Sequence, residues 1–228
     1  GGSVMDPSAL GGHDLGFDAT EEEQVISSYV ALGDSFTAGT GCDPGLCWAD
    51  RLAKALPGRV LYRNLAVHGA TSTQVREQVG PALQLEPDLV TVVCGTNDVL
   101  FTNNVDVLTY SRNFGGILRK LQRVLPGVRI LTATAPERWD FLPIGPRTRA
   151  KLEQNIKRIN QATRSLAAAH DVPVLEVADD ERLGDPENFS ADGLHPSPEG
   201  HAKAARAFAA LLHERYGIEL NEEVLGSA

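Results

Sequence analysis

The sequence predicts an α/β protein: a three-layer α/β/α sandwich built around a flavodoxin-like, five-stranded parallel sheet. Three observations support this fold class. Short runs rich in β-branched residues alternate along the chain with longer amphipathic segments. Most of the short runs are apolar throughout, as strands of a parallel sheet covered by helices are. Right-handed crossovers between such strands place the helices in two layers around one sheet. The flavodoxin-like strand order is an expectation that the sequence alone does not fix.

Five runs are candidate strands. They are VISSYVAL (25–32), VLYRNLAV (60–67), LVTVVC (89–94), VRILTATA (128–135) and VPVLEV (172–177). All except 60–67 are apolar enough to be buried on both faces of the sheet.

Helices are expected between and after these strands, and their ends carry local signals. One helix stops at Pro57-Gly58 and another at Pro126-Gly127. The last helix opens with Ser197 as N-cap and Pro198 at the first helical position. The expected helices are 48–56, 71–84, 105–125, 147–170 and 198 to about 216.

The chain is expected to form one domain over residues 24–217. Its 228 residues, 42% of them hydrophobic, suffice for one sizeable core. GGSV before Met5 resembles a tag remnant, and the acidic, glycine-rich residues 1–23 are expected to be a flexible extension. Residues 218–228 are expected to be a C-terminal tail.

Composition excludes several classes of function. The net charge of −9 argues against binding to nucleic acid or to an anionic membrane surface. No stretch approaches the ~18 apolar residues of a membrane span. No basic and apolar leader is present, so we expect a cytoplasmic protein, or a secreted one if a signal peptide has been removed. The oligomeric state is not determined by the sequence.

The cysteines and histidines do not form a metal-binding pattern. Cys42, Cys47 and Cys94 form no CxxC motif, and no Cys/His cluster has zinc spacing, so neither a metal nor a cofactor is expected. Cys42 and Cys47 could close a small loop, but reduced thiols are the simpler interpretation.

Small and polar residue types follow the predicted strands. Gly33–Gly39 (GDSFTAG) follows the first strand, His68–Thr71 the second, and Gly95–Asp98 the third. Asp192–Pro196 precedes the last helix. Because ligands bind outside the carboxyl ends of the strands in such a sheet, these four blocks are expected to meet at one edge.

These four blocks, in this order, resemble the GDSL/SGNH hydrolase family of serine esterases, lipases and deacetylases. The resemblance spans residues 25 to about 212. A GDS tripeptide alone would be weak evidence, whereas the four blocks at these separations are specific. The resemblance implies the SGNH hydrolase fold and an acyl-enzyme mechanism.

Three residues are expected to be catalytic: Ser35, Asp192 and His195. A serine hydroxyl becomes a good nucleophile when a neighbouring base accepts its proton, and His195 is the candidate base. Asp192 lies three residues before His195, so a turn can place its carboxylate against the imidazole.

The resemblance also implies an oxyanion hole formed by the backbone amides of Ser35 and Gly69 and the side chain of Asn97. Such donors stabilise the charge that develops on the carbonyl oxygen. Apart from the resemblance, Gly69 could merely form a turn and Asn97 could merely cap the next segment.

The second block departs from the family pattern. Ala66 replaces a common glycine, and His68 occupies a position that is commonly small. His68 is expected to border the pocket, where it could contact polar substrate groups; a surface histidine without a role is the alternative. We expect Asp34 to support the nucleophile turn and Cys94 to be a buried strand residue. The other histidines are expected to be solvated: His13, His170, His201 and His213.

The substrate is expected to be a small-molecule acyl ester. Aromatic content is 6% and no long apolar lid is evident, which disfavours a lipase that works at an oil interface. Trp139 and Phe141 could stack on a sugar or cover an acyl chain, or could simply belong to a packed loop. The favoured function is an esterase or deacetylase acting on a sugar or natural-product ester. An acyltransferase of the same fold is the alternative, and a non-catalytic binding module is a remote one.

Overall fold

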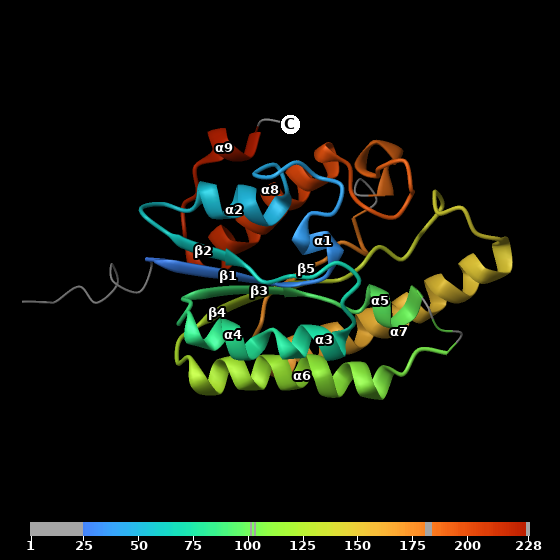
Figure 1. Ribbon diagram of the computed structural model, residues 1–228, viewed down its shortest axis with the longest axis horizontal. Helices are drawn as coiled ribbons and strands as arrows, with labels where there is room; N and C mark the ends of the chain where they lie inside the picture. Colours follow the sequence, from blue (N-terminus) through green and yellow to red (C-terminus); the bar gives the residue numbers. More distant parts are fainter. Residues whose placement is uncertain (1–24, 101, 103, 181–183, 227–228) are drawn as a thin grey trace, which may run out of the picture.

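One parallel sheet of five strands forms the centre of the protein (Figure 1). The strand order is β2-β1-β3-β4-β5, and every neighbouring pair is parallel. This is the flavodoxin-like order, so the predicted fold class is confirmed. The strands are β1 (Ser28–Gly33), β2 (Leu61–Asn64), β3 (Leu89–Val93), β4 (Arg129–Ala133) and β5 (Val174–Leu175).

The structure is a computed structural model that describes residues 25–100, 102, 104–180 and 184–226. The extension expected over residues 1–23 lies outside the described residues. None of the described helices is both long enough and apolar enough to cross a membrane.

Helices cover both faces of the sheet (Figure 1). Successive residues of β1 point to opposite faces, so Val30 and Leu32 join one core cluster while Tyr29 and Ala31 join the other. The first cluster packs against α3 (Ser72–Glu77), α4 (Val79–Gln84), α6 (Val107–Val124) and α7 (Pro146–Ala169); the second packs against α2 (Trp48–Ala55), α8 (Pro198–Tyr216) and α9 (Glu222–Gly226).

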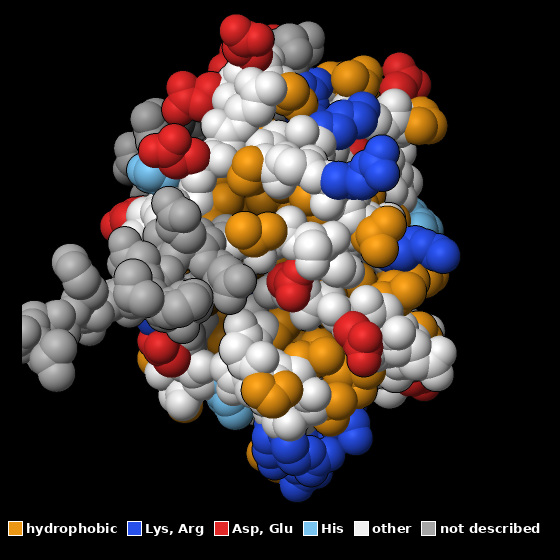
Figure 2. Space-filling view, turned by 90° about the vertical axis from the view of Figure 1, so that its left-hand side faces the viewer, with side chains coloured by type: hydrophobic (Ala, Val, Ile, Leu, Met, Phe, Trp, Pro, Cys, Tyr) orange, Lys and Arg blue, Asp and Glu red, His pale blue; other side chains and the backbone are white. Residues whose placement is uncertain are grey.

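The edge strand β2 is more exposed than the central strands. β1 is buried along its whole length, whereas β2 alternates between exposed and partly buried residues. This agrees with the polar character predicted for residues 60–67. The end of the molecule that carries the amino ends of the strands shows acidic and basic side chains interspersed with hydrophobic ones (Figure 2).

The segment 71–84, predicted as one helix, is divided into α3 and α4 at Gln78. Pro81 has no N–H to donate to the carbonyl of Glu77, and its ring crowds that carbonyl, so the helix is interrupted there. The interruption connects the helix to the end of β1. The Gln78 side chain turns inward, accepts a hydrogen bond from Gly33 N and donates one to Gly33 O, both at 2.9 Å.

Residues 218–228, for which the sequence predicts a tail, include part of the core. The side chains of Ile218 and Leu225 are buried, and Leu225 belongs to α9. Asn221 N donates to Ala55 O at the end of α2. Apolar residues spaced through an otherwise polar segment are the sequence signal that could have indicated this packing.

Candidate active site

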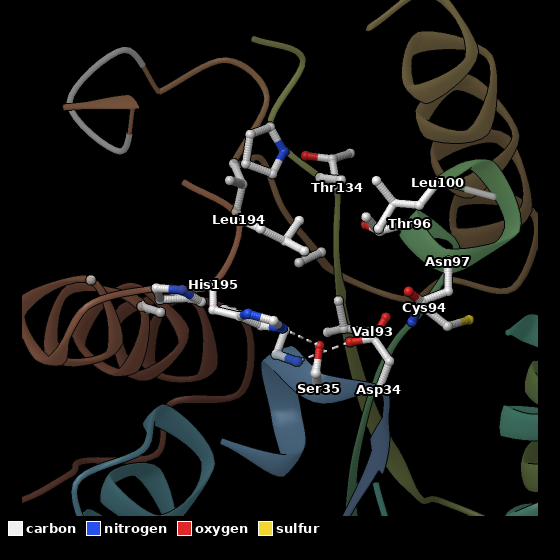
Figure 3. Close-up of a pocket in the computed structure, with 18 of the residues that line it drawn as sticks. Asp34, Ser35, Val93, Cys94, Thr96, Asn97, Leu100, Thr134, Leu194 and His195 are labelled. Carbon is white, nitrogen blue, oxygen red and sulfur yellow. Dashed lines mark hydrogen bonds between the residues drawn. The ribbon is translucent and has the colours of Figure 1, made fainter. Parts of the chain in front are cut away.

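The four sequence blocks meet at the carboxyl ends of the strands, around a cavity of about 280 Å³. We call this space, which Ser35, Asn97, Leu100, Leu194 and His195 help to line, the reaction cavity (Figure 3). In a parallel sheet all carboxyl ends lie at one edge, so segments that are far apart in the sequence converge there.

Ser35 is the first residue of α1 (Ser35–Ala38), directly after β1. Asp34 is the N-cap of this short helix, and its Oδ1 accepts a hydrogen bond from Phe36 N at 3.0 Å. The cap fixes the turn that projects the Ser35 hydroxyl beyond the end of the strand. Asp34 therefore supports the nucleophile turn, as expected from the sequence.

Ser35, His195 and Asp192 form one chain of hydrogen bonds. The Ser35 Oγ lies 3.0 Å from His195 Nε2 (Figure 3). On the other side of the ring, His195 Nδ1 lies 2.5 Å from Asp192 Oδ2. Ser35 and His195 are 160 residues apart in the sequence. The Ser35–His195 distance lies within hydrogen-bond reach for transfer of the hydroxyl proton to the imidazole.

A tight turn orients the Asp192 carboxylate. While Oδ2 faces the imidazole, Oδ1 accepts hydrogen bonds from the backbone N–H groups of Leu194 and His195, each at 2.9 Å. The Ser190 hydroxyl donates to the same oxygen at 3.2 Å. Every carboxylate oxygen therefore has a fixed partner, and the side chain cannot rotate without losing several hydrogen bonds.

Gly193 makes this turn possible in two ways. Its φ of +68° lies in the left-handed region that favours glycine. A Cβ atom there would lie 2.0 Å from the carbonyl oxygen of Phe141. The loop after β4 thus packs directly against the Asp192–His195 turn and limits its position.

The hydrogen bonds hold Asp192 in its ionised form. Partial burial acts to raise the pKa of this carboxyl, but the hydrogen bonds from the His195 ring and from the N–H groups of Leu194 and His195 outweigh it. The pKa of Asp192 consequently lies well below its ordinary value. An ionised carboxylate in this position favours a proton on His195 Nδ1 and leaves Nε2 free to accept one.

Asn97 and Gly69 both line the reaction cavity. Asn97 Nδ2 donates one hydrogen bond to Ala70 O at 3.0 Å, which ties the third block to the second. An amide nitrogen carries two hydrogens, so one remains for another acceptor. Gly69 has a φ of +79°, and its N–H donates to no described residue.

Asp98 fixes the relation between these two blocks. Its carboxylate accepts hydrogen bonds from Ser72 N at 2.7 Å and from Ser72 Oγ at 2.5 Å. Asn113 of α6 donates to the same Ser72 hydroxyl at 3.1 Å. Asp98 thus joins the start of α3 to α5 (Thr96–Leu100) and takes no direct part in the Ser35–His195–Asp192 chain. Ser72 and Asn113 were not among the site residues predicted from the sequence.

Trp139 and Phe141 have different environments. Trp139 is buried, lines the reaction cavity, and has an indole Nε1 without a hydrogen-bond partner among the described residues. Phe141 is 42% exposed and packs on Phe189, with ring centroids 5.7 Å apart, rather than lining the cavity. Arg149 of α7 holds this loop by donating to the carbonyls of Trp139, Leu142 and Ile144.

His68 stands at the rim of the reaction cavity. Its Nδ1 lies 2.9 Å from the Thr40 hydroxyl, and its ring centroid lies 5.8 Å from that of His195. The structure therefore brings His68 to the site, with one ring nitrogen held and the other unbonded within the described part of the chain.

His201 is not the solvated side chain that the sequence analysis expects. It is fully buried between α8 and α2, where its Nδ1 accepts a hydrogen bond from Trp48 N at 3.1 Å. Burial, together with the nearby Arg51 guanidinium, lowers the pKa of His201 to about 4, so the ring is neutral. Its spacing on the apolar face of α8 was the signal that could have indicated burial.

The three cysteines are free thiols. Cys94 is not the buried strand residue expected from the sequence: it follows the end of β3, is partly buried and lines the reaction cavity. Its pKa is raised well above the ordinary value, first by desolvation and then by the carboxylates of Asp98 and Asp34. A thiol that resists ionisation is a poor nucleophile. No group of three or more potential metal ligands gathers within the described residues.

Comparisons with known proteins identify the family and the fold. Residues 31–203 match the model of the GDSL-like lipase/acylhydrolase family. No curated protein matches the chain.

Several solved structures share the fold. A lipase/acylhydrolase from Enterococcus faecalis has 22% identity and a TM-score of 0.66, covering 86% of this chain and 97% of its own. The psychrotrophic esterase EstA from Pseudoalteromonas sp. has 18% identity and a TM-score of 0.64, covering 82% and 97%. The acetyl xylan esterase AlAXEase has 17% identity and a TM-score of 0.64, covering 80% and 98%. At these identities the similarity is one of fold.

Proposed function

The chain belongs to the GDSL-like lipase/acylhydrolase family and is a hydrolase of ester bonds, and we propose that it cleaves small acyl esters through an acyl-enzyme on Ser35. The natural substrate we propose is an ester of a sugar or of a similar natural product. The observation that carries this proposal is the hydrogen-bonded chain Ser35–His195–Asp192, which opens onto a largely apolar cavity.

The first chemical step is attack on the ester carbonyl. Ser35 Oγ forms a bond to the carbonyl carbon while its proton moves to His195 Nε2, 3.0 Å away. The imidazole becomes a cation in this step, and the Asp192 carboxylate at 2.5 Å stabilises it. The low pKa of Asp192 supports this role, because the carboxylate stays ionised throughout the neutral range.

The negative charge that develops on the carbonyl oxygen needs hydrogen-bond donors. We assign this role to the N–H groups of Ser35 and Gly69 and to the second amide hydrogen of Asn97. The hydrogen bond from Asn97 to Ala70 O supports the assignment, because it orients the amide before the substrate arrives. A preoriented donor spends little free energy on reorganisation during the reaction.

The tetrahedral intermediate then collapses. His195 returns its proton to the leaving alcohol, and the acyl group remains esterified to Ser35. Water attacks the acyl-enzyme with His195 again as the base, and the free acid leaves. If a second alcohol attacked instead of water, the same site would transfer the acyl group.

The size and lining of the reaction cavity favour a short acyl chain. Its volume is about 280 Å³, and Val93, Leu100, Ala133 and Leu194 contribute apolar surface. An acetyl to butyryl group fits such a space, whereas a long fatty-acyl chain would extend outside it.

Release of p-nitrophenol from acetyl, butyryl and octanoyl esters tests the proposal. We expect turnover of the two short esters, and its loss in Ser35→Ala. Ser111→Ala on α6, which removes a hydroxyl away from the cavity, is the matched control and should retain activity. Equal activity of wild type and Ser35→Ala would refute the nucleophile assignment. Adding glycerol to the same assay separates the two reaction classes, since transfer yields a new ester where hydrolysis yields free acid.

A further inference from the structure

The His68–Gly69 segment is shared by two cavities. Both residues line the reaction cavity and also a second, more open cavity of about 410 Å³. The second cavity lies over α3 and α4 and is lined by Leu65, Val67, Ala70, Gln74, Glu77, Gln78 and Pro81 in addition to the shared pair. None of the catalytic steps described above uses this space.

The two cavities differ in the groups that they present. The second cavity combines apolar surface from Val67 and Pro81 with polar side chains from α3. Gln74 Oε1 accepts from Thr71 N at 2.9 Å, which leaves its amide hydrogens available. Within the described residues, the Glu77 carboxylate has no hydrogen-bond partner. Apolar surface next to unpaired donors and acceptors matches a pyranose ring, which has apolar faces and a rim of hydroxyls.

His68 stands where a leaving alcohol must pass. His195 has to protonate the leaving oxygen, so the alcohol stays within hydrogen-bond reach of this ring. The His68 ring centroid lies 5.8 Å from that of His195, close enough for one small molecule to contact both rings. The acyl group occupies the apolar part of the reaction cavity, so the alcohol extends towards His68 and the second cavity.

The Thr40 contact sets what His68 can bind. With Nδ1 held by the Thr40 hydroxyl at 2.9 Å, Nε2 is the ring nitrogen left for substrate. Depending on the tautomer, Nε2 donates or accepts a hydrogen bond. A substrate hydroxyl satisfies either case, whereas an alkyl group gains no hydrogen bond from the ring.

We propose that the second cavity is the subsite for a polyhydroxylated leaving alcohol, a sugar, and that His68 is the residue that selects it. The inference rests on the proposed function and deepens it, because it assigns a binding place to the alcohol half of the ester and names the residue that selects it. His68 is a positioning group for the alcohol, and the chemistry stays with Ser35 and His195.

Two acetates of matched shape test the selection. Methyl 6-O-acetyl-glucopyranoside and cyclohexylmethyl acetate share the acyl group and a six-membered ring, but only the first carries hydroxyls. We expect His68→Ala to lower the ratio of their kcat/KM values by about tenfold, the size of one hydrogen bond. His68→Asn, which retains a donor and an acceptor, should restore part of the ratio.

Two carboxylate variants test whether the second cavity contributes to the selection. Glu77→Ala should also lower the ratio, whereas Glu214→Ala, which removes an exposed carboxylate from α8, should leave it unchanged. A ratio for His68→Ala within about twofold of wild type, below the smallest usual effect of a hydrogen bond, would overturn the proposal.

A binding measurement keeps the inference separate from the proposed function. If wild type and Ser35→Ala hydrolyse both acetates equally, the assignment of Ser35 as nucleophile is refuted, and the sugar subsite is tested separately by binding. Methyl glucopyranoside is then titrated into the Ser35→Ala protein, and the imidazole resonances are followed by NMR. A shift of the His68 signals without a shift of the His213 signals supports the sugar subsite. Unmoved His68 signals refute it.

Discussion

Replacing Asp192 by asparagine is predicted to abolish most activity while preserving the fold. The two carboxylate oxygens have different tasks: Oδ1 accepts from the N–H groups of Leu194 and His195, and Oδ2 faces His195 Nδ1. Asparagine can perform the first task with its carbonyl oxygen. It cannot perform the second, because an NH2 group donates where a carboxylate accepts.

The magnitude follows from these contacts. Turning the asparagine amide over would set its NH2 against two backbone N–H donors and lose two hydrogen bonds, about 2 kcal/mol or more. That penalty favours the carbonyl-to-backbone orientation by about 30-fold. The NH2 group then donates to His195 Nδ1 and forces the imidazole proton onto Nε2, which can no longer accept the Ser35 proton. In serine hydrolases the wrong tautomer costs about 10⁴-fold in kcat, and we expect a loss of that order.

The assay is the kcat of p-nitrophenyl acetate hydrolysis, with thermal unfolding as the check on folding. Asp192→Asn should melt close to the wild type, because the turn keeps its hydrogen bonds. Asp140→Asn makes the same chemical change on an exposed side chain that pairs with Arg138, and should keep full activity. If Asp192→Asn retained more than about a tenth of wild-type kcat, the tautomer argument would be refuted.

Four further predictions concern other parts of the site. Asn97→Ala should lower kcat by about 100- to 1,000-fold, as loss of one oxyanion donor does, and an effect on KM alone would contradict this role. Gly193→Ala should lower the melting temperature and kcat together, because alanine in a left-handed φ costs about 1–2 kcal/mol and its Cβ would clash with Phe141 O. Unchanged kinetics would contradict the role of this turn in positioning Asp192 and His195. Trp139→Leu enlarges the reaction cavity and should shift the preference from acetyl towards octanoyl esters in the chain-length series, whereas an unchanged profile would mean that the acyl chain does not reach it. Burial raises the pKa of Asp34 to about 6, above the ordinary value of 3.8, so the folded state binds more protons than the unfolded state and loses stability as pH rises from about 4 to 6. Asp34→Asn, whose side-chain oxygen can still cap α1, should remove that pH dependence in unfolding titrations. It should also stabilise the protein at pH 7 by up to about 3 kcal/mol.

Much of the architecture can be predicted from short stretches of sequence. Pro57-Gly58 ends α2, and Ser197-Pro198 begins α8, with Ser197 as the N-cap. The apolar runs of β1, β3 and β4 predict buried parallel strands, and the carboxyl ends of parallel strands converge. Fold class and the meeting of the four blocks therefore follow from local pattern and one rule of topology.

The environments of individual side chains could not be predicted from the sequence and became known only from the tertiary structure. Trp139 and Phe141 are two residues apart and chemically alike, yet one lines the reaction cavity and the other packs outside it. The carbonyls held by Arg149 and the contact between Gly193 and Phe141 decide this, and both depend on segments that meet only after folding.

The sequence by itself determined the order of the elements, the central sheet and the residue types at its carboxyl edge, because caps, breakers and apolar periodicity act over a few neighbouring residues. Only the tertiary structure decided that His68 lies beside His195 and that a second cavity adjoins the first. These properties depend on the direction of side chains in loops. That direction is fixed by contacts with residues remote in sequence, such as the hydrogen bond between Thr40 and His68, and no local pattern encodes it.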